Sequence, residues 1–334
     1  REGLVALLIK GLLRILSWGY AVGIGIVGWM YHSRIRKEHR APVPVISVGN
    51  ITLGGTGKTP FTMFLAEYLL QSGRSPAILI RGYGEDENRM IKDTLADVPV
   101  FVGQNRLASA RSAAGNGCDV LVLDDGFQHR KLARDLNIVL VDSVRFFGNE
   151  SLFPRGTLRE PVSSLERADI LVLTKVDQLD ELERERASEK LKGLSKGKSV
   201  VQMRHKPFFL NDVTGGAYQV DSIKNEKVCL VSGIVDPDYF AFLIKGLGAE
   251  IVSRFDFDDH HQFTRVDMMK VYKRALETKA DKIIITKKDH VKIKDLDVPE
   301  IEEKLFVLDI VLDIVKGRER LIAGLNSIMA GNRA

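Results

Sequence analysis

Residues 49 to 60 read GNITLGGTGKTP, and this segment sets the architecture of the chain. The apolar run Val43 to Val48 precedes it and predicts a buried strand. The amphipathic segment FTMFLAEYLLQSG follows it and predicts a helix that ends at Gly73. In such a strand–turn–helix unit, backbone N–H groups converge on phosphate oxygens. The sequence therefore predicts a phosphate loop that binds a nucleoside triphosphate.

Each residue type in this loop has an expected chemical role. The Lys58 ammonium is expected to reach the β- and γ-phosphates, and the Thr59 hydroxyl is expected to hold Mg²⁺. Glycine lets the main chain approach the phosphates without a Cβ clash. Thr52 stands where the usual pattern has its first glycine, so the glycine pair further along is expected to make the turn. The expected nucleotide-binding residues are Gly54, Gly55, Thr56, Gly57, Lys58 and Thr59.

Further apolar runs alternate with helical segments, as in a parallel sheet covered by helices on both faces. Predicted strands lie at Pro76 to Ile80, Asp119 to Asp125 and Leu136 to Asp142. The second of these reads DVLVLDD and ends in paired carboxylates, which is typical of a metal-binding strand in a phosphate-loop fold. We expect Asp124 or Asp125 to contact Mg²⁺ directly or through water.

Polar residues just beyond the strand ends are candidates for binding a second substrate, because ligands gather at the carboxyl ends of parallel strands. Gln128 and His129 follow the acidic pair. Arg155 and Arg159 flank a Pro/Gly loop in FPRGTLREP and could hold an anion. By spacing alone, a solvated loop explains these two arginines equally well.

The pattern T-K-x-D occurs twice after a predicted strand, in ILVLTKVD (170–177) and IIITKKD (283–289). It resembles the element with which GTPases read guanine. A membrane-associated GTPase or nucleotide-dependent switch is therefore the alternative function. Two copies weaken that alternative, since one nucleotide needs one such site. Competition between ATP and GTP would separate the two hypotheses.

The second half of the chain predicts a smaller α/β domain. We expect a membrane-associated helical segment over 1–40, a phosphate-loop core over 41–200, a β-rich connector over 201–226 and the smaller domain over 227–334. Its densest polar cluster is FDDHHQF, which contains Asp258, Asp259, His260 and His261. A histidine oriented by a carboxylate could accept a proton from a hydroxyl, although a surface turn is the alternative.

The amino-terminal segment is apolar and differs from everything after it. Only Lys10 and Arg14 are charged between residues 3 and 31, and HSRIRKEHR follows. A cleaved signal peptide would carry its charges first. A spanning helix would place Lys10 and Arg14 in or near hydrocarbon, whereas an interfacial helix places the tryptophans and tyrosines at headgroup level. We favour membrane association, with the basic flank and the body on the cytoplasmic side; a helix packed on the body is the alternative.

Composition bounds these interpretations. Of 334 residues, 45% are apolar and 28% are charged, so a packed core is feasible. Two cysteines exclude a disulfide scaffold and a Cys-based zinc site. The net charge of +5 is too small to argue for nucleic acid, but it suits a phosphate-rich ligand or an anionic membrane surface. Nothing in the sequence indicates a protein partner.

Seven segments in this order resemble the tetraacyldisaccharide 4′-kinase family, the lipid A 4′-kinases of Gram-negative bacteria. These are GNITLGGTGKTP, RGYG, DDGFQHRKLARD, RFFGN, PRGTLREP, FDDHHQF and ITKKDHVK. The resemblance extends from about Ile15 to about Leu312. It implies a phosphate-loop core, a smaller carboxyl-terminal domain and a membrane-associated amino-terminal helix. It also implies transfer of the ATP γ-phosphate to the 4′-hydroxyl of a tetraacyl glucosamine disaccharide 1-phosphate, at the cytoplasmic leaflet of the inner membrane.

The resemblance also implies site residues. The family usually has a longer segment after RGYG that ends in G-D-E, whose aspartate acts with the histidine on the sugar hydroxyl. Here RGYG runs directly into EDENRMIKD, Glu85 replaces the glycine, and Asp86 is the best match. We expect Mg²⁺ and ATP on the loop, with Asp86, His260, Lys58 and Asp125 as catalytic residues. The residues expected to contact the lipid substrate are Arg81, Gln128, His129, Arg155, Arg159 and His261.

Overall fold

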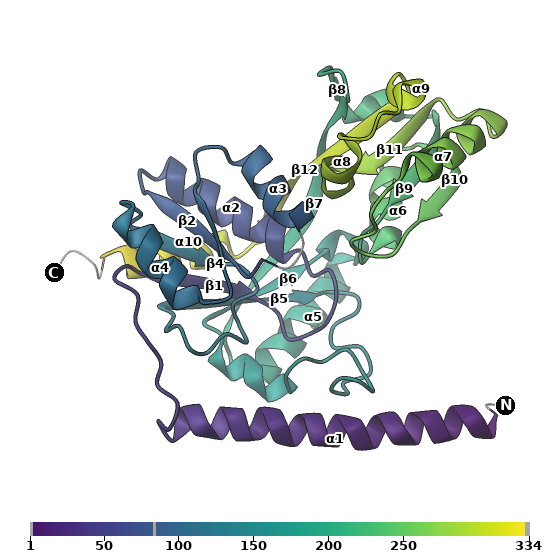
Figure 1. Ribbon diagram of the computed structural model, residues 1–334. Helices are drawn as coiled ribbons and strands as arrows, with labels where there is room; N and C mark the ends of the chain where they lie inside the picture. Colours follow the sequence, from purple (N-terminus) through teal and green to yellow (C-terminus); the bar gives the residue numbers. More distant parts are fainter. Residues whose placement is uncertain (1–2, 83–84, 331–334) are drawn as a thin grey trace. The chain divides into compact units, whose positions relative to one another are not determined.

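The computed structural model describes residues 3–82 and 85–330, and the chain divides into two compact units (Figure 1). Unit 1 comprises Arg1–Tyr83, Leu95–Arg204 and Ile314–Ala334. Unit 2 comprises Gly84–Thr94 and His205–Asp313. Two long strands, β7 (Ser199–Asp212) and β12 (Leu305–Lys316), each contribute residues to both units. The predicted boundaries at residues 40, 200 and 226 stay predictions.

Unit 1 contains a parallel sheet whose strands run in the order β3–β2–β4–β1–β5–β6–β7. Its strands are apolar on both faces, as expected for a sheet covered by helices on each side. The strand bounds are β1 Val45–Gly49, β2 Pro76–Ile80, β3 Val100–Val102, β4 Val120–Leu123, β5 Leu136–Asp142 and β6 Ile170–Thr174.

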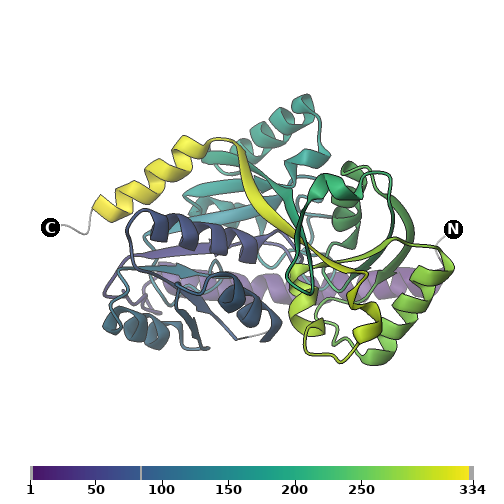
Figure 2. The ribbon, with the colours of Figure 1, turned by 90° about the horizontal axis from the view of Figure 1, so that it is seen from above.

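Helices cover both faces of this sheet. One face packs against α4 through Ala110 and Ala113 and against α5 through Ala187 and Leu191. The other face carries α2 and α10, which lie together in Figure 2, and Gly324 of α10 approaches the side chain of Ile170. The bounds are α1 Leu4–His32, α2 Lys58–Gln71, α4 Arg106–Gly115, η1 Val162–Arg167, η2 Val176–Gln178, α5 Glu181–Leu194 and α10 Arg318–Ala330.

Unit 2 contains its own sheet segment in the order β10–β9–β11–β12–β7, with β8 antiparallel to β7. Helix α6 packs on one face, and α7 with α8 and α9 packs on the other. The bounds are α3 Glu85–Thr94, β8 Ala217–Gln219, η3 Val220–Ile223, β9 Lys227–Ser232, α6 Pro237–Gly246, β10 Glu250–Asp256, α7 Arg265–Glu277, β11 Lys282–Thr286, α8 Lys287–Ile293 and α9 Pro299–Glu302.

Helix α3 belongs to unit 2 although it lies between strands of unit 1 in the sequence. It packs against α8. Ion pairs join the two segments: Arg89 to Asp295 at 2.6 Å, and Lys294 to Asp93. No helix was predicted over these residues, because their two adjacent apolar side chains make no helical stripe.

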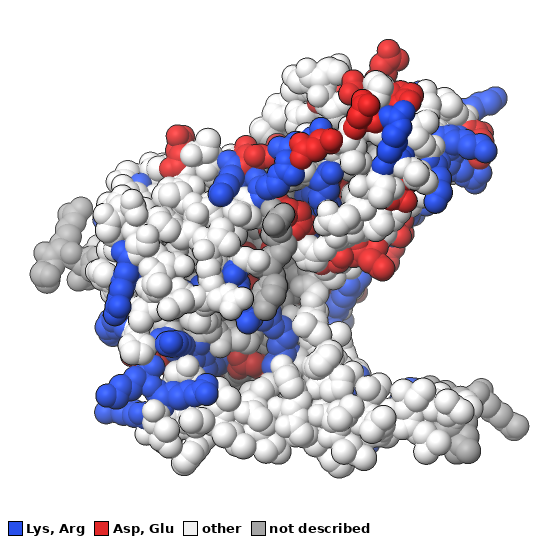
Figure 3. Space-filling view, viewed as in Figure 1, with Lys and Arg blue, Asp and Glu red and all other residues white. Residues whose placement is uncertain are grey.

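The amino-terminal helix α1 is long and apolar enough over Val5–His32 to cross a membrane, by length and composition. Most of its large apolar side chains are exposed, including Trp18 and Trp29. Figure 3 shows it as a rod with few charges along its length and with Lys and Arg side chains near its carboxyl end. It contacts the 150–162 segment of the same unit: the Ser17 hydroxyl donates to the Leu152 carbonyl at 2.9 Å, and the Tyr20 hydroxyl donates to the Arg159 carbonyl at 3.1 Å.

Candidate active site

The phosphate loop connects the buried strand β1 to helix α2. Gly57 caps α2 with φ 83°, in the left-handed region that favours glycine, and Gly54 has φ 121°. The Asn50 amide donates to the Thr56 hydroxyl at 3.0 Å inside the loop. The backbone N–H of Leu53 donates to the Thr157 carbonyl at 2.6 Å, which holds the loop against the 150–162 segment. The predicted loop residues therefore lie together at the amino end of α2.

Asp124 directly follows strand β4 and faces the first turns of α2. Its carboxylate accepts from the Thr62 hydroxyl at 2.8 Å and from the Thr59 hydroxyl at 3.3 Å. The Asp124 residue is buried, with 6% of its surface exposed. The structure thus brings a carboxylate and the loop hydroxyl together, and oxygen donors of this kind are the ligands Mg²⁺ prefers.

Asp125 is the cation-paired member of the acidic pair. The Arg159 guanidinium donates to its two carboxylate oxygens at 2.7 and 3.1 Å, and the Lys58 ammonium lies 3.7 Å away. Burial alone would raise the pKa of the Asp125 carboxyl, but the positive charges of Lys58, Arg159 and Arg106 together hold this pKa below its ordinary value. Asp125 is therefore ionised at neutral pH and links the loop lysine to Arg159.

The turn after the acidic pair packs tightly on β1. A Cβ at Gly126 would lie 2.6 Å from the Ser47 hydroxyl oxygen, so only glycine fits there. The Gly126 N–H donates to the Val48 carbonyl, and the Gln128 amide donates to the Asn50 carbonyl at 2.8 Å. Gln128 thus contacts the backbone of the phosphate loop.

Basic side chains surround His129. Burial, followed by the charges of Arg106, Arg134, Arg81 and Lys131, lowers the pKa of His129 to about 4. Burial likewise lowers the pKa of Arg106 to about 10, with Asp124 and Asp125 opposing the shift. His129 is therefore a neutral imidazole at physiological pH, next to side chains that attract anions.

His260 and Asp86 form a pair in unit 2. The His260 Nδ1 atom lies 3.0 and 3.2 Å from the two oxygens of the Asp86 carboxylate. His260 has φ 62°, a left-handed conformation that few non-glycine residues adopt and that recurs at functional sites. The Asp86 side chain is 4% exposed, whereas that of His260 is 45% exposed. A solvent-accessible imidazole oriented by a buried carboxylate can accept a proton.

His261 lies in a different environment from His260. Its ring stacks on Phe257 at a centroid distance of 4.4 Å and contacts Phe263 edge to face. Its Nε2 atom lies 3.3 Å from the Asp267 carboxylate at the start of α7. These contacts make His261 part of the packing of the 256–263 segment. The structure therefore does not place it beside Asp86.

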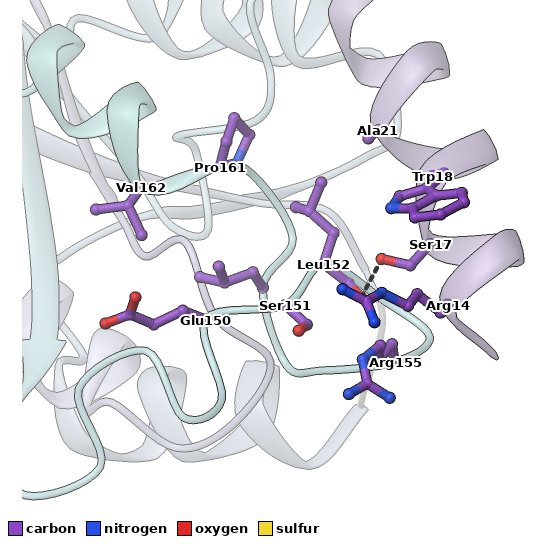
Figure 4. A pocket seen from close by; sticks show the side chains of 11 residues that line it. Arg14, Ser17, Trp18, Ala21, Glu150, Ser151, Leu152, Arg155, Pro161 and Val162 are labelled. Atoms are coloured by element: carbon purple, nitrogen blue, oxygen red, sulfur yellow. Dashed lines mark hydrogen bonds between the residues drawn. The ribbon is translucent and has the colours of Figure 1, made fainter. Parts of the chain in front are cut away.

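A cavity of about 370 Å³ lies between α1 and the 150–162 segment (Figure 4). Arg14 and Trp18 line it from α1, and Leu152 and Arg155 line it from the segment. Both guanidinium groups lie at the same end of the cavity in Figure 4. The two arginines of this segment therefore have different surroundings: Arg155 lines the cavity, whereas Arg159 binds Asp125.

The two T-K-x-D copies are held by carboxylates of this chain. The Lys175 ammonium lies 2.6 Å from the Asp142 carboxylate, and both side chains are buried. In the second copy, the pattern lysine Lys287 lies 3.3 Å from the Asp309 carboxylate, and Lys288 at the variable position lies 3.0 Å from Asp259. These contacts leave the lysines paired with carboxylates of the protein.

Sequence reasoning missed three polar residues of these sites. Arg106 is 3% exposed and donates to the Asp124 carbonyl at 3.1 Å. Thr62 binds the Asp124 carboxylate, and Lys288 adjoins Asp86. Arg106 and Thr62 belong to no recognised motif; Lys288 lay inside one that suggested another role. Arg81 follows β2 at the surface, and its charge acts on His129.

The acidic residues do not form a dedicated metal cage. Within residues 3–82 and 85–330, no group of three or more His, Cys, Asp or Glu side chains is arranged to hold a metal ion. The Thr59 hydroxyl and the Asp124 and Asp125 carboxylates fit Mg²⁺ in the way it usually binds beside phosphates, through a few protein oxygens and water.

Comparisons with known proteins identify the family to which the chain is similar. A family model described as tetraacyldisaccharide-1-P 4′-kinase matches residues 9–329. A tetraacyldisaccharide 4′-kinase of Syntrophus aciditrophicus is 36% identical over 318 residues, covering 86% of this chain and 85% of that protein. One from Anaeromyxobacter sp. (strain Fw109-5) is 35% identical over 351 residues, covering 97% and 91%. The crystal structure of "apo" form LpxK from Aquifex aeolicus in complex with ATP superimposes with a TM-score of 0.73 at 27% identity, covering 96% of this chain and 99% of that one.

Proposed function

Because the chain belongs to the tetraacyldisaccharide-1-P 4′-kinase family, we propose that its residues move the γ-phosphate of ATP to the 4′-hydroxyl of an acylated glucosamine disaccharide 1-phosphate. The chain is an ATP-dependent phosphotransferase with an alcohol as acceptor. The observation that carries the residue assignment is the ion pair between the loop lysine, Lys58, and Asp125. The predicted phosphate-loop fold with a parallel sheet is confirmed by the superposition on the ATP-bound relative.

Unit 1 binds the triphosphate in this proposal. The loop backbone and the amino end of α2 receive the phosphate oxygens, and Lys58 neutralises charge that develops on the transferred group. Thr59, Asp124 and Asp125 would hold Mg²⁺, which supplies further charge neutralisation when bound. Arg159 orients Asp125 by two parallel hydrogen bonds, so the carboxylate is fixed before the nucleotide arrives.

The His260–Asp86 pair accepts the proton of the sugar hydroxyl. As the hydroxyl oxygen bonds to the γ-phosphorus, the bond from that phosphorus to the bridging oxygen breaks and ADP leaves. Phosphoryl transfer asks little covalent chemistry of the protein, so positioning and charge neutralisation dominate. The 3.0 Å contact between His260 and Asp86 supports this role, because it fixes the imidazole orientation.

The cavity beside α1 suits part of an amphiphilic acceptor. Trp18 and Leu152 offer apolar surface, and Arg14 and Arg155 offer guanidinium groups to an anionic headgroup. A lipid with four acyl chains leaves a bilayer at high cost, since each CH₂ transferred to water costs about 0.8 kcal/mol. An enzyme for such a substrate therefore works at the membrane.

Membrane attachment through α1 follows from the same reasoning. The exposed apolar helix and the basic residues after it, Arg34, Arg36, Lys37 and Arg40, would bind the anionic cytoplasmic leaflet of the inner membrane. Deletion of residues 1–30 is expected to release the protein from vesicles that contain anionic lipid. If the shortened protein still sediments with these vesicles, the attachment lies elsewhere.

One assay tests the function. The protein is incubated with ATP labelled at the γ-phosphate and with the acylated disaccharide 1-phosphate, and label on the lipid is measured. A matched acceptor that already carries a 4′-phosphate should receive no label. Hydrolysis of GTP that needs no lipid, with no label on the lipid, would support the nucleotide switch instead; the comparisons do not favour that alternative.

A further inference from the structure

The second T-K-x-D copy borders the His260–Asp86 pair, and the nucleotide-binding role does not explain it. Thr286 caps helix α8, and its side chain accepts from the Asp289 N–H. This cap places Lys288 in the first turn of α8, facing α3 and the 256–263 segment. Its side chain is 16% exposed. All of these residues belong to unit 2.

Lys288 meets three carboxylates from two other segments. Its ammonium lies 3.0 Å from an Asp259 oxygen, 3.4 Å from a Glu87 oxygen and 3.8 Å from an Asp86 oxygen. Two of these carboxylates also face the imidazole: Asp86 contacts His260 Nδ1, and the second Asp259 oxygen lies 3.4 Å from His260 Nε2. Lys288 and His260 are therefore joined through both Asp86 and Asp259.

From this arrangement we propose that Lys288 is a positioning residue, which holds the Asp86 and Asp259 carboxylates aligned on His260 for removal of the acceptor proton. This inference rests on the proposed kinase function. Three carboxylates at this spacing repel one another unless a cation lies among them. The Lys288 ammonium lies among them, so the carboxylates can stay close together around the imidazole of His260.

The surrounding charges are compatible with this role. Burial would lower the pKa of the Lys288 ammonium, but the charges of Glu87, Asp259 and Asp86 outweigh burial and raise it above its ordinary value. Lys288 therefore stays charged across the pH range in which a histidine titrates. Other charged groups on the packed segments form the ion pairs Arg89–Asp295, Lys294–Asp93, His261–Asp267, Lys287–Asp309 and Lys292–Asp289. These segments also carry His290 on α8 and the exposed side chains of Lys92 and Asp258.

The chain offers a matched control next to Lys288. Lys287 precedes it on α8, and its ammonium contacts Asp309 at 3.3 Å. Lys288→Met removes the charge and keeps the length of the side chain, Lys288→Arg keeps the charge, and Glu87→Gln removes one negative charge from the same cluster. Lys287→Met removes a neighbouring charge that does not face the cluster.

The experiment measures kcat, KM for the lipid, the dissociation constant of ATP and the pH profile of kcat/KM for full-length variants. Removing the ammonium favours protonation of the groups around it, so the acidic limb for Lys288→Met should move to higher pH. Its kcat should fall roughly tenfold, with ATP binding unchanged. Lys288→Arg should restore most activity, Glu87→Gln should move the limb to lower pH, and Lys287→Met should match the wild type.

Two results would overturn the proposal. One is a wild-type kcat and pH limb for Lys288→Met while His260→Ala is impaired. The other is a loss of kcat with an unmoved limb in Lys288→Met, which indicates a merely structural lysine. If Lys288→Met does not fold, an unmoved limb in Glu87→Gln overturns the proposal. Failure of the kinase function itself is distinct, because the wild type would then leave the lipid unlabelled.

Discussion

The two T-K-x-D copies share four letters and a preceding strand, yet they occupy different surroundings. In the copy at 174–177, Lys175 has φ 57°, and its ammonium joins the end of β6 to Asp142 at the end of β5. In the copy at 286–289, the pattern starts α8, and Lys288 at the variable position meets three carboxylates. The first copy is a buried ion pair between strands, and the second adjoins a titratable pair. The pattern lysine is Lys175 in the first copy and Lys287, which lies 3.3 Å from the Asp309 carboxylate, in the second. Neighbouring side chains, and not the pattern, decide what these lysines contact.

The largest expected effect tests whether nucleotide binding and turnover depend on the phosphate loop and not on either T-K-x-D copy. Lys58→Ala removes the ammonium proposed to contact the phosphates, and turnover should fall on the order of 10⁴-fold. The fold should persist, because the Lys58 contact to Asp125 spans 3.7 Å and Arg159 still holds that carboxylate. Label transfer and circular dichroism measure the two effects. Near-normal activity would refute the loop assignment.

The next effect tests the first copy as a structural ion pair. Lys175→Met leaves the Asp142 carboxylate buried without its ammonium, so the free energy of unfolding should fall by roughly 3–5 kcal/mol. The preference for ATP over GTP should not change. Denaturant unfolding and nucleotide competition measure both. Lys196→Met is the surface control, expected to change stability by about 0.5 kcal/mol or less. A switch of nucleotide preference in Lys175→Met would make this copy a base-reading element.

A third test concerns the histidines beside the second copy. His260→Ala removes the proposed proton acceptor, and kcat should fall on the order of 10²-fold with a smaller change in KM. His261→Ala removes a ring that packs between aromatic side chains. Its main effect should therefore be a lower melting temperature, and not a lower kcat. Steady-state kinetics and thermal unfolding separate the two. The reverse pattern would move the catalytic role to His261.

The smallest effect concerns His129, the neutral histidine of unit 1. Because the folded-state pKa of His129 is about 4, the unfolded chain binds more protons than the folded chain below its ordinary pKa. The contribution of His129 to the free energy of unfolding is therefore fully present above about pH 6.5. It is lost as the pH falls from there towards the folded-state pKa of about 4. His129→Gln should lose less stability over this window, as measured by melting temperatures. Equal losses in the variant and the wild type would contradict the assignment.

Local patterns predicted most of unit 1. The strand–loop–helix of residues 43–73 and the acidic strand end were readable because neighbours in sequence make each of them, and the predicted fold is confirmed. The contact between Asp86 and His260 joins residues 174 positions apart, so only family resemblance suggested it. Arg106 carried no signal, because a single arginine at the start of an alanine-rich helix looks like a surface residue. The roles of these residues stay predictions.

The discontinuity of unit 2 limits how this protein can be divided. The chain enters unit 2 at Gly84, leaves it at Thr94, and returns from His205 to Asp313. A fragment cut to 205–313 would keep His260, Lys288 and Asp259 but would lack the carboxylate of Asp86. Exchange of the 205–313 segment alone with another protein therefore separates the acidic residue from its histidine. A chimera keeps Asp86 and His260 together only when residues 84–94 and 205–313 come from the same parent protein.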